Sequence, residues 1–329
     1  MVAGEQGIFA FDGLLLAAGM TRTSASKVVV FVASLGTAAL ASAAPAASAS
    51  AAMTRGTQAA VSSVTTITYC TDGGQPLGMT LFRPPADDRV VPVVVQVHGG
   101  AWEHGTRWTS LSQSSALAGL VGSGIAVASV DYRLAPAHLW PDQIVDVMCA
   151  ARYLRAHSAV FGIDPLRVGA WGSSAGGQLV SLLGTAPDMP RWEAGQYQGE
   201  SSSVQAVVDE FGPADLAVSD WGSYVAGVIH TVFHVEPSRS SAFLEAASPL
   251  DHVAPGDPPF LILQGTEDHI VPADQSEALA QHLAAAHVPV KLVLVTGGTH
   301  GLETSGEHPS AARLSADIVS YFVGVLRQH

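Results

Sequence analysis

Positive charge is scarce in this sequence. Lys27 and Lys291 are its only lysines among 329 residues, and the formal net charge is −13 at pH 7. An acidic surface repels phosphate backbones and anionic membranes, which argues against nucleic acid or a membrane as a partner. Hydrophobic residues make up 48% of the chain and supply ample material for a buried sheet. The length fits one large α/β domain or two small ones.

The sequence also lacks a hydrophobic run that would span a membrane comfortably. An apolar stretch over residues 28–40 follows a short basic segment that begins at Met20, and small residues follow over 41–52. This order is typical of a secretory signal peptide, with cleavage after Ala43 or Ala49. We therefore expect a leader over residues 1–52, in which 1–19 are an over-long start and 20–43 or 20–49 are the signal peptide. An N-terminal anchor helix is the alternative.

Cysteine occurs only twice, at Cys70 in a predicted strand and at Cys149 in a predicted helix. Export to an oxidising compartment would permit a bridge between them. Sequence separation does not establish that their Cα atoms come within bonding range. A disulfide and two buried thiols are both open interpretations at this stage.

Strand-like and helix-like segments alternate through residues 53–329, which predicts a single α/β domain with a doubly wound, mostly parallel, eight-stranded sheet. Several strand segments are near-continuous apolar runs, as expected for parallel strands covered on both faces. The predicted strands are residues 65–70, 79–82, 91–97, 125–130, 168–171, 204–208, 259–264 and 290–295. The predicted helices are residues 109–120, 141–157, 175–183, 273–285 and 310–325.

One connection breaks this rhythm. After Pro213, about 45 residues pass before the next predicted strand at Pro259, which is long for a strand–helix connection. Loops of this length are usually lids or binding loops. We expect residues 214–257 to form a small cap or substrate loop.

A Gly-Ser-Ser-Ala-Gly segment at residues 172–176 directly follows one of the predicted strands. This is the G-x-S-x-G nucleophile elbow, with Ser174 at its centre. The flanking glycines are needed because the strand turns sharply into a helix and lifts one hydroxyl clear of the sheet. Ser173 is in the wrong register, since it lacks glycine two residues to either side.

An acid and a histidine follow the serine in chain order, each just beyond a predicted strand. Asp268 follows the seventh strand and His300 the eighth. The carboxyl ends of parallel strands share one edge of a sheet, where ligands bind. His300 is expected to take the proton of Ser174 and later give it to the leaving alcohol, while Asp268 orients the imidazole. Glu267 and Asp251 are the alternative acids.

Negative charge on a tetrahedral intermediate requires donors that are already in place. The third predicted strand ends in His98-Gly99-Gly100-Ala101-Trp102. Backbone N–H groups of Gly99, Gly100 or Ala101, together with that of Ala175 at a helix N-terminus, are the expected oxyanion hole. Trp102 lines the substrate pocket in this interpretation or, equally, belongs to the core.

These motifs, with Asp131-Tyr132-Arg133-Leu134-Ala135-Pro136, resemble the α/β-hydrolase superfamily. Within it, they are similar to hormone-sensitive-lipase-like and acetylxylan/feruloyl-esterase-like carboxylesterases. The resemblance covers nearly the whole chain from about Thr65. It implies ester hydrolysis without metal or cofactor. Many relatives carry a third glycine where this chain has Ala101, but a backbone donor survives that change.

Other charged and histidine side chains receive structural interpretations. We expect Asp131 and Arg133 to form an ion pair that braces the fourth strand, and His98 to orient the oxyanion loop. His230 and His234 stand four residues apart, a spacing that binds zinc on a helix. The sequence shows no third ligand nearby, so we expect no metal site.

The resulting prediction is a secreted (extracellular) serine carboxylesterase that acts on short-chain or acetyl esters. Its substrate is a small ester or a polysaccharide-linked ester, with no cofactor, no nucleic acid and no stable membrane association after cleavage. An amidase or formamidase that uses the same triad is the alternative. A non-catalytic ligand-binding protein of the same fold is disfavoured, because such proteins typically lose a triad member.

Overall fold

The computed structural model describes residues 63–85, 89–109, 114–192, 194–218, 220–238, 240–302, 306 and 308–327. The chain divides into two units, Met1–Pro45 and Ala46–His329, and all described residues belong to the second. The predicted leader over residues 1–52 lies outside the described residues.

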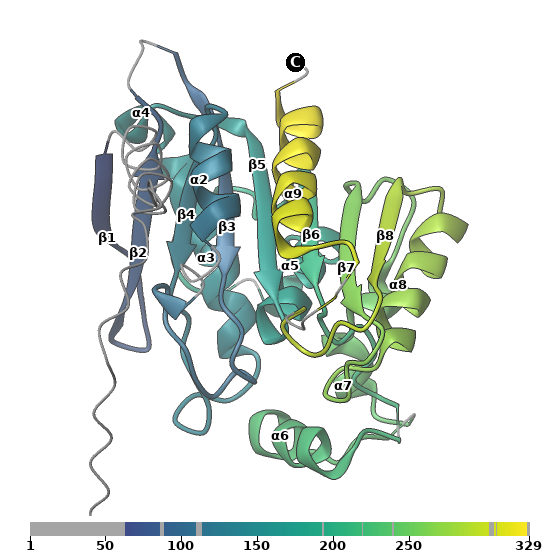
Figure 1. The fold of residues 1–329 in the computed structure, drawn as a ribbon. Helices are drawn as coiled ribbons and strands as arrows, with labels where there is room; N and C mark the ends of the chain where they lie inside the picture. Colours follow the sequence, from purple (N-terminus) through teal and green to yellow (C-terminus); the bar gives the residue numbers. More distant parts are fainter. Residues whose placement is uncertain are drawn as a thin grey trace, which may run out of the picture. The chain divides into compact units, whose positions relative to one another are not determined.

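Eight strands form one sheet in the order β1-β2-β4-β3-β5-β6-β7-β8 (Figure 1). β1 pairs antiparallel with β2, and β2 pairs antiparallel with β4, whereas all other neighbours are parallel. The predicted mostly parallel, eight-stranded sheet of an α/β-hydrolase fold is therefore confirmed. The strands are β1 (Ser63–Asp72), β2 (Gln75–Arg83), β3 (Val91–Val97), β4 (Ala126–Val130), β5 (Ile163–Ser173), β6 (Ala206–Glu210), β7 (Phe260–Gly265) and β8 (Val290–Val295).

The central strands are buried on both faces. Every residue of β4, β6 and β7 is buried, as is all of β3 after Val91. This explains why their sequences read as apolar runs instead of alternating patterns.

Helices cover both faces of the sheet. α2 (Ser114–Gly122) and α9 (Ala311–Leu326) pack against each other over one core, and α3 (Asp142–Ala156), α5 (Ala175–Thr185) and α8 (Ala273–Ala285) contribute to the other. α9 buries Leu314, Ile318 and Phe322, which are spaced four residues apart on one helical face. The short elements α4 (Ser158–Phe161) and η2 (Pro190–Trp192) complete this part of the fold.

Four of the five predicted helices agree with the structure to within one or two residues at each end. The helix predicted over residues 109–120 is the exception, because α2 begins only at Ser114. The chain before it closes a turn, in which the Thr109 amide donates to the Thr106 carbonyl at 2.8 Å.

The segment predicted as a cap contains α6 (Ser223–Phe233), α7 (Ala242–Ala247) and η3 (Pro249–His252). Figure 1 shows α6 and α7 below the sheet, at the end where β5 leads into α5. The apolar face of α6 packs back onto the body of the protein. Phe233 lies 5.5 Å from the Trp102 ring and 5.1 Å from the Trp140 ring, measured between centroids.

A disulfide joins Cys70 of β1 to Cys149 of α3, with their Cα atoms 6.6 Å apart. The alternative that the sequence left open is thus settled in favour of the bridge. It fastens the edge strand of the sheet to a helix 79 residues further along the chain.

The predicted ion pair between Asp131 and Arg133 is wrong. Asp131 pairs with Arg107, which precedes β4 in the chain. Arg133 turns toward α3 instead, where its guanidinium lies 2.7 Å from the fully buried carboxylate of Asp146 and 2.9 Å from that of Asp142. Both residues do brace the exit of β4, but each with a different partner.

Candidate active site

The nucleophile elbow forms where β5 ends and α5 begins. Ser174 has φ 54° and ψ −120°, a backbone conformation that residues other than glycine rarely adopt. A Cβ on Gly172 would collide with the Gly176 carbonyl, and a Cβ on Gly176 would collide with that of Val97. These collisions explain why the sequence has glycine on both sides of the serine.

The turn also needs support from the neighbouring strand. The Ser174 amide donates to the carbonyl of Glu210, the last residue of β6, at 2.8 Å. This bond fixes the strained residue against the sheet. The hydroxyl is thereby presented at the carboxyl edge, where the sequence places the other candidate residues.

Ser174, His300 and Asp268 meet in one hydrogen-bonded chain. His300 Nε2 lies 3.0 Å from Ser174 Oγ, and His300 Nδ1 lies 2.7 Å from Asp268 Oδ2. An ionised carboxylate only accepts hydrogen bonds, so Nδ1 carries the imidazole proton and donates a hydrogen bond to Asp268. Nε2 is then free to accept the proton of the serine hydroxyl, which is the arrangement a general base requires.

Asp268 is held in its ionised, accepting form. Its side chain is fully buried, and its Oδ1 accepts the backbone amides of Ile270 and Val271 at 2.8 and 2.9 Å. Burial alone raises the pKa of this carboxyl. The hydrogen bond and the charge of His300, together with the two amides, outweigh burial and leave the pKa below its ordinary value.

The two alternative acids lie elsewhere. Glu267 is exposed to solvent, although its backbone amide donates to the Gly298 carbonyl. Asp251 lies in η3 of the cap, among Asp215, Glu245 and two histidines that act on its charge. Neither is hydrogen-bonded to His300 within the described part of the chain.

Candidate oxyanion donors lie beside the serine. Gly100 and Ala101 both have positive φ, at 118° and 56°, and their loop packs tightly against the elbow. A Cβ on Gly99 would lie 2.8 Å from the Ser173 carbonyl. Among the described residues, the amides of Gly100, Ala101 and Ala175 donate to no protein oxygen, which leaves them available to a ligand.

His98 lies behind this loop. It is 1% exposed, stacks on Tyr132 with ring centroids 4.2 Å apart, and its Nδ1 lies 2.7 Å from the Gly99 carbonyl. Burial lowers the pKa of His98, so the ring is neutral and Nδ1 donates to that carbonyl. The contact is consistent with the predicted role of His98 in orienting the loop.

A cavity of about 630 Å³ opens beside Ser174. Its lining includes the serine, the imidazole, the candidate oxyanion loop and several apolar side chains. None of the described lining residues is a lysine, arginine, aspartate or glutamate. They are Gly99, Gly100, Ala101, His104, Gly105, Thr109, Ser173, Ser174, Phe211, Tyr224, Ile270, His300 and Gly301.

The sequence model of the BD-FAE family matches residues 79–283. This range contains the elbow, the oxyanion loop and Asp268, and covers more than half of the chain. The chain belongs to the BD-FAE family, a hormone-sensitive-lipase-like group of α/β-hydrolases.

Individual relatives agree with this assignment. The chain is similar to Esterase LipC of Mycobacterium tuberculosis, with 32% identity over 67% of this chain and 55% of the relative. It is similar to Esterase LipQ of the same organism, with 30% identity over 77% of this chain and 60% of the relative. The chain thus spans less than two thirds of the length of these relatives. A solved structure described as a truncated carbohydrate esterase from gut microbiota aligns with 27% identity and a TM-score of 0.70, over 81% of this chain and 97% of that one.

Trp102 does not line the substrate pocket of this BD-FAE member, and it belongs to the core, which was the alternative interpretation. It is 3% exposed, and its indole N–H donates to Gln178 Oε1 of α5 at 3.0 Å. It is not among the residues that line the described cavity. The structure places Trp102 in the core between α5 and the cap, where it packs on Phe233.

Several cavity residues were not found from the sequence. Phe211 directly follows β6, just as Ser174 follows β5, so its position at the carboxyl edge was a usable signal. Tyr224 lies on α6 of the cap, and Ile270 follows the acid by two residues. Nothing in the local sequence of Tyr224 marks it as a cavity residue, because its position depends on how the cap folds back.

No group of three or more metal-binding side chains occurs among the described residues. His230 pairs instead with Glu236 on the surface, at 2.8 Å. In the same part of the chain, no helix combines the length and the apolar character that crossing a membrane requires.

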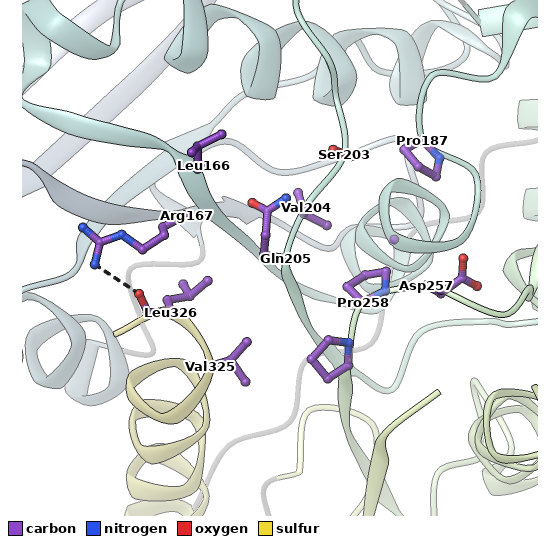
Figure 2. A pocket seen from close by; sticks show the side chains of 13 residues that line it. Leu166, Arg167, Pro187, Ser203, Val204, Gln205, Asp257, Pro258, Val325 and Leu326 are labelled. Carbon is purple, nitrogen blue, oxygen red and sulfur yellow. Dashed lines mark hydrogen bonds between the residues drawn. The ribbon is translucent and has the colours of Figure 1, made fainter. Parts of the chain in front are cut away.

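A second cavity, of about 510 Å³, lies at the opposite edge of the sheet, near the starts of β5, β6 and β7. Figure 2 shows Arg167 bonded to the Leu326 carbonyl at its margin, and the same guanidinium pairs with Asp164 at 2.7 Å. Its described lining holds neither histidine nor cysteine, so it offers no base comparable to His300.

Proposed function

We propose that this BD-FAE protein is a serine carboxylesterase that cleaves short-chain or acetyl esters through an acyl-enzyme on Ser174. The observation that carries the proposal is the hydrogen-bonded chain from Ser174 through His300 to Asp268. Ser174 lies at the edge of a cavity, close to the candidate donor amides of Gly100, Ala101 and Ala175. Relatives named as esterases support ester hydrolysis over other chemistry.

Acylation begins when Ser174 Oγ attacks the ester carbonyl carbon while His300 Nε2 takes the hydroxyl proton. The new C–O bond places negative charge on the carbonyl oxygen, and the amides of Gly100, Ala101 and Ala175 stabilise it. The bond to the alcohol oxygen then breaks. His300 delivers its proton to that oxygen, and the alcohol leaves.

Deacylation repeats these steps with water. His300 takes a proton from a water molecule as that molecule attacks the acyl carbon. The bond to Ser174 Oγ breaks, the proton returns to the serine, and the carboxylic acid is released. Asp268 remains ionised throughout and stabilises the imidazolium that forms twice in each turnover.

The lining of the cavity favours a neutral substrate. Within the described lining, no cation is present to pair with a carboxylate or phosphate, and no anion is present to pair with an amine. Phe211, Tyr224 and Ile270 offer a limited apolar wall that suits a short acyl group. The similarity to a carbohydrate esterase supports acetyl groups on polysaccharide as one source of such esters.

We propose further that the protein is secreted. The basic, apolar and small-residue order over residues 20–52 supports export. The disulfide between Cys70 and Cys149 supports it as well, because such bonds persist in oxidising compartments.

The test is hydrolysis of p-nitrophenyl esters of increasing acyl length by the full chain, with Ser174→Ala as the blank. We expect the highest kcat/KM at acetate or butyrate and no enzymatic rate in the variant. A preference for long acyl chains would contradict the proposed substrate class. Absence of hydrolysis at every length would overturn the esterase proposal, and parallel assays on aryl amides would then identify an amidase.

A further inference from the structure

His300 has few restraints for a catalytic base. It lies in the connection between β8 and α9, outside any helix or strand, and its side chain is 26% exposed. Two hydrogen bonds hold the imidazole, one to Asp268 and one to Ser174. If the proposed function holds, the second bond is lost whenever Ser174 is acylated, because its oxygen then has no proton to donate. The bond to Asp268 alone would let the ring swing about that contact.

A third contact lies against the imidazole. The Phe211 ring lies 4.9 Å from the His300 ring, measured between centroids, with 66° between the planes. Phe211 is 4% exposed and lines the cavity beside the base. A phenyl ring has no donor or acceptor that could compete for the imidazole proton, so this contact restrains the ring without changing its tautomer.

Phe211 is itself held firmly. Its backbone has φ 46°, in the left-handed region that an aromatic residue rarely occupies. Its amide donates to the Leu263 carbonyl of β7 at 2.8 Å, and the next amide, of Gly212, donates to Asp209 Oδ1 at 2.9 Å. Strain of this kind persists where the surrounding structure over-determines the conformation, and it clusters at functional sites.

Asp209 is the anchor of this turn. Its carboxylate is fully buried, and its second oxygen accepts the hydroxyl of Ser181 in α5 at 3.0 Å. A Cβ on Gly177 would collide with Asp209 Oδ1, and one on Gly212 would lie 2.5 Å from it. The turn is therefore locked to the helix that begins at the nucleophile.

The turn after β6 therefore contacts both Ser174 and His300. The carbonyl of Glu210 accepts the Ser174 amide, and the ring of Phe211 packs on His300. We infer that Phe211 is a positioning residue, which keeps the His300 imidazole aimed at Ser174 through the acyl-enzyme stage. This inference rests on the proposed function and extends it to a residue outside the triad and the oxyanion loop.

The experiment compares Phe211→Leu, Phe211→Tyr and the control Phe260→Leu. Phe260 is equally buried, but it lies at the far end of β7 from the acid. Leucine removes the ring and keeps most of the apolar volume, whereas tyrosine restores the ring. Because a misplacement of about 1 Å at a reacting group lowers rates roughly 100-fold, we expect Phe211→Leu to lose between about 10-fold and 100-fold in kcat. Phe211→Tyr should recover most of kcat, and Phe260→Leu should stay within about twofold of wild type.

A spectroscopic measurement tests the position of the ring apart from turnover. We expect the Nδ1 proton between His300 and Asp268 to give a far-downfield proton NMR resonance, which its loss in His300→Gln would assign. We expect this resonance to broaden through exchange with water in Phe211→Leu and to stay sharp in Phe260→Leu. If Phe211→Leu does not fold, Phe211→Met takes its place, because methionine adapts to irregular space.

An unchanged kcat with only a raised KM in Phe211→Leu, or a resonance as sharp as in wild type, would reduce Phe211 to a cavity wall and overturn the inference. Wild-type hydrolysis is measured first. Its absence would overturn the proposed function, whereas the NMR comparison still decides the positioning role of Phe211.

Discussion

Asp268 and Glu267 are adjacent carboxylates with different surroundings. The Asp268 side chain is fully buried and lies 2.7 Å from the imidazole, whereas Glu267 faces solvent. Their order in the chain did not distinguish them, since either acid follows β7 closely. The difference arises because the amides of Ile270 and Val271 turn back onto one carboxylate only.

We expect Asp268→Asn to lower kcat on the order of 10⁴-fold, because an amide in this place favours the wrong imidazole tautomer. Glu267→Gln is the matched control and should stay within about twofold of wild type. Steady-state hydrolysis of p-nitrophenyl acetate measures both. A larger loss in the Glu267 variant would assign the role of the acid to that residue.

Asp209 provides a test of pH dependence. Burial raises the pKa of this carboxyl to about 6, against the opposing hydrogen bonds from Ser181 and Gly212. The native state therefore holds a proton that the unfolded chain releases near pH 4, so this group favours folding at low pH. Its contribution is lost as the pH rises from about 4 to about 6.

Relative to Asp209→Asn, wild type should lose on the order of 2 kcal/mol of unfolding free energy across this pH range. Urea unfolding at several pH values measures the difference. A difference that does not vary with pH would show that the carboxylate titrates at its ordinary pKa.

At the scale of elements, the apolar runs predicted the central strands well, because parallel strands that are buried on both faces have short, continuous apolar sequences. α6 was not predicted. Its buried residues Val225, Val228, Ile229 and Val232 do follow a helical spacing, but they are β-branched and equally suit a strand. The helix is settled by tertiary contacts, since Phe233 at its end packs on Trp102 and Trp140.

The ion pair between Arg133 and Asp146 joins the exit of β4 to α3. The Asp146 side chain is fully buried, and that of Arg133 is 7% exposed. Breaking a buried pair leaves an uncompensated charge, so we expect Asp146→Asn to lower the unfolding free energy by about 3 kcal/mol. The control is Arg313, whose side chain is 67% exposed and pairs with Asp317; Arg313→Gln should change the unfolding free energy by about 0.5 kcal/mol or less. Equal midpoints in urea for both variants would contradict this account.

At the scale of the whole molecule, the chain order of Ser174, Asp268 and His300 was enough to predict their meeting. Parallel strands deliver residues from distant parts of the sequence to one edge, whatever the loops between them do. The place of Tyr224 in the cavity and the neighbours of Trp102 were not predictable, because they depend on how the cap packs onto the rest of the fold. The sequence thus indicated the proposed reaction, while the shape of the cavity required the structure.

The disulfide is the one covalent tie across the described fold, joining the sheet edge to α3. Bridging residues 79 apart restricts the unfolded chain, which corresponds to about 4 kcal/mol in a chain-entropy treatment. We expect the double variant Cys70→Ala/Cys149→Ala to have an unfolding free energy lower by a few kcal/mol and therefore a lower urea midpoint. Its kcat should stay near wild type at 25 °C, because the bridge contacts none of the triad. Unchanged unfolding in the variant would show that the bridge contributes no stability.

The central claim is that Ser174 is a nucleophile activated by His300. The most direct measurement is labelling of the full chain by a fluorophosphonate probe, followed by intact mass and peptide mapping. We predict a single adduct on Ser174, no adduct in Ser174→Ala, and labelling slower by at least about 100-fold in His300→Ala. An unlabelled wild-type chain, or an adduct on any other residue, would contradict the account.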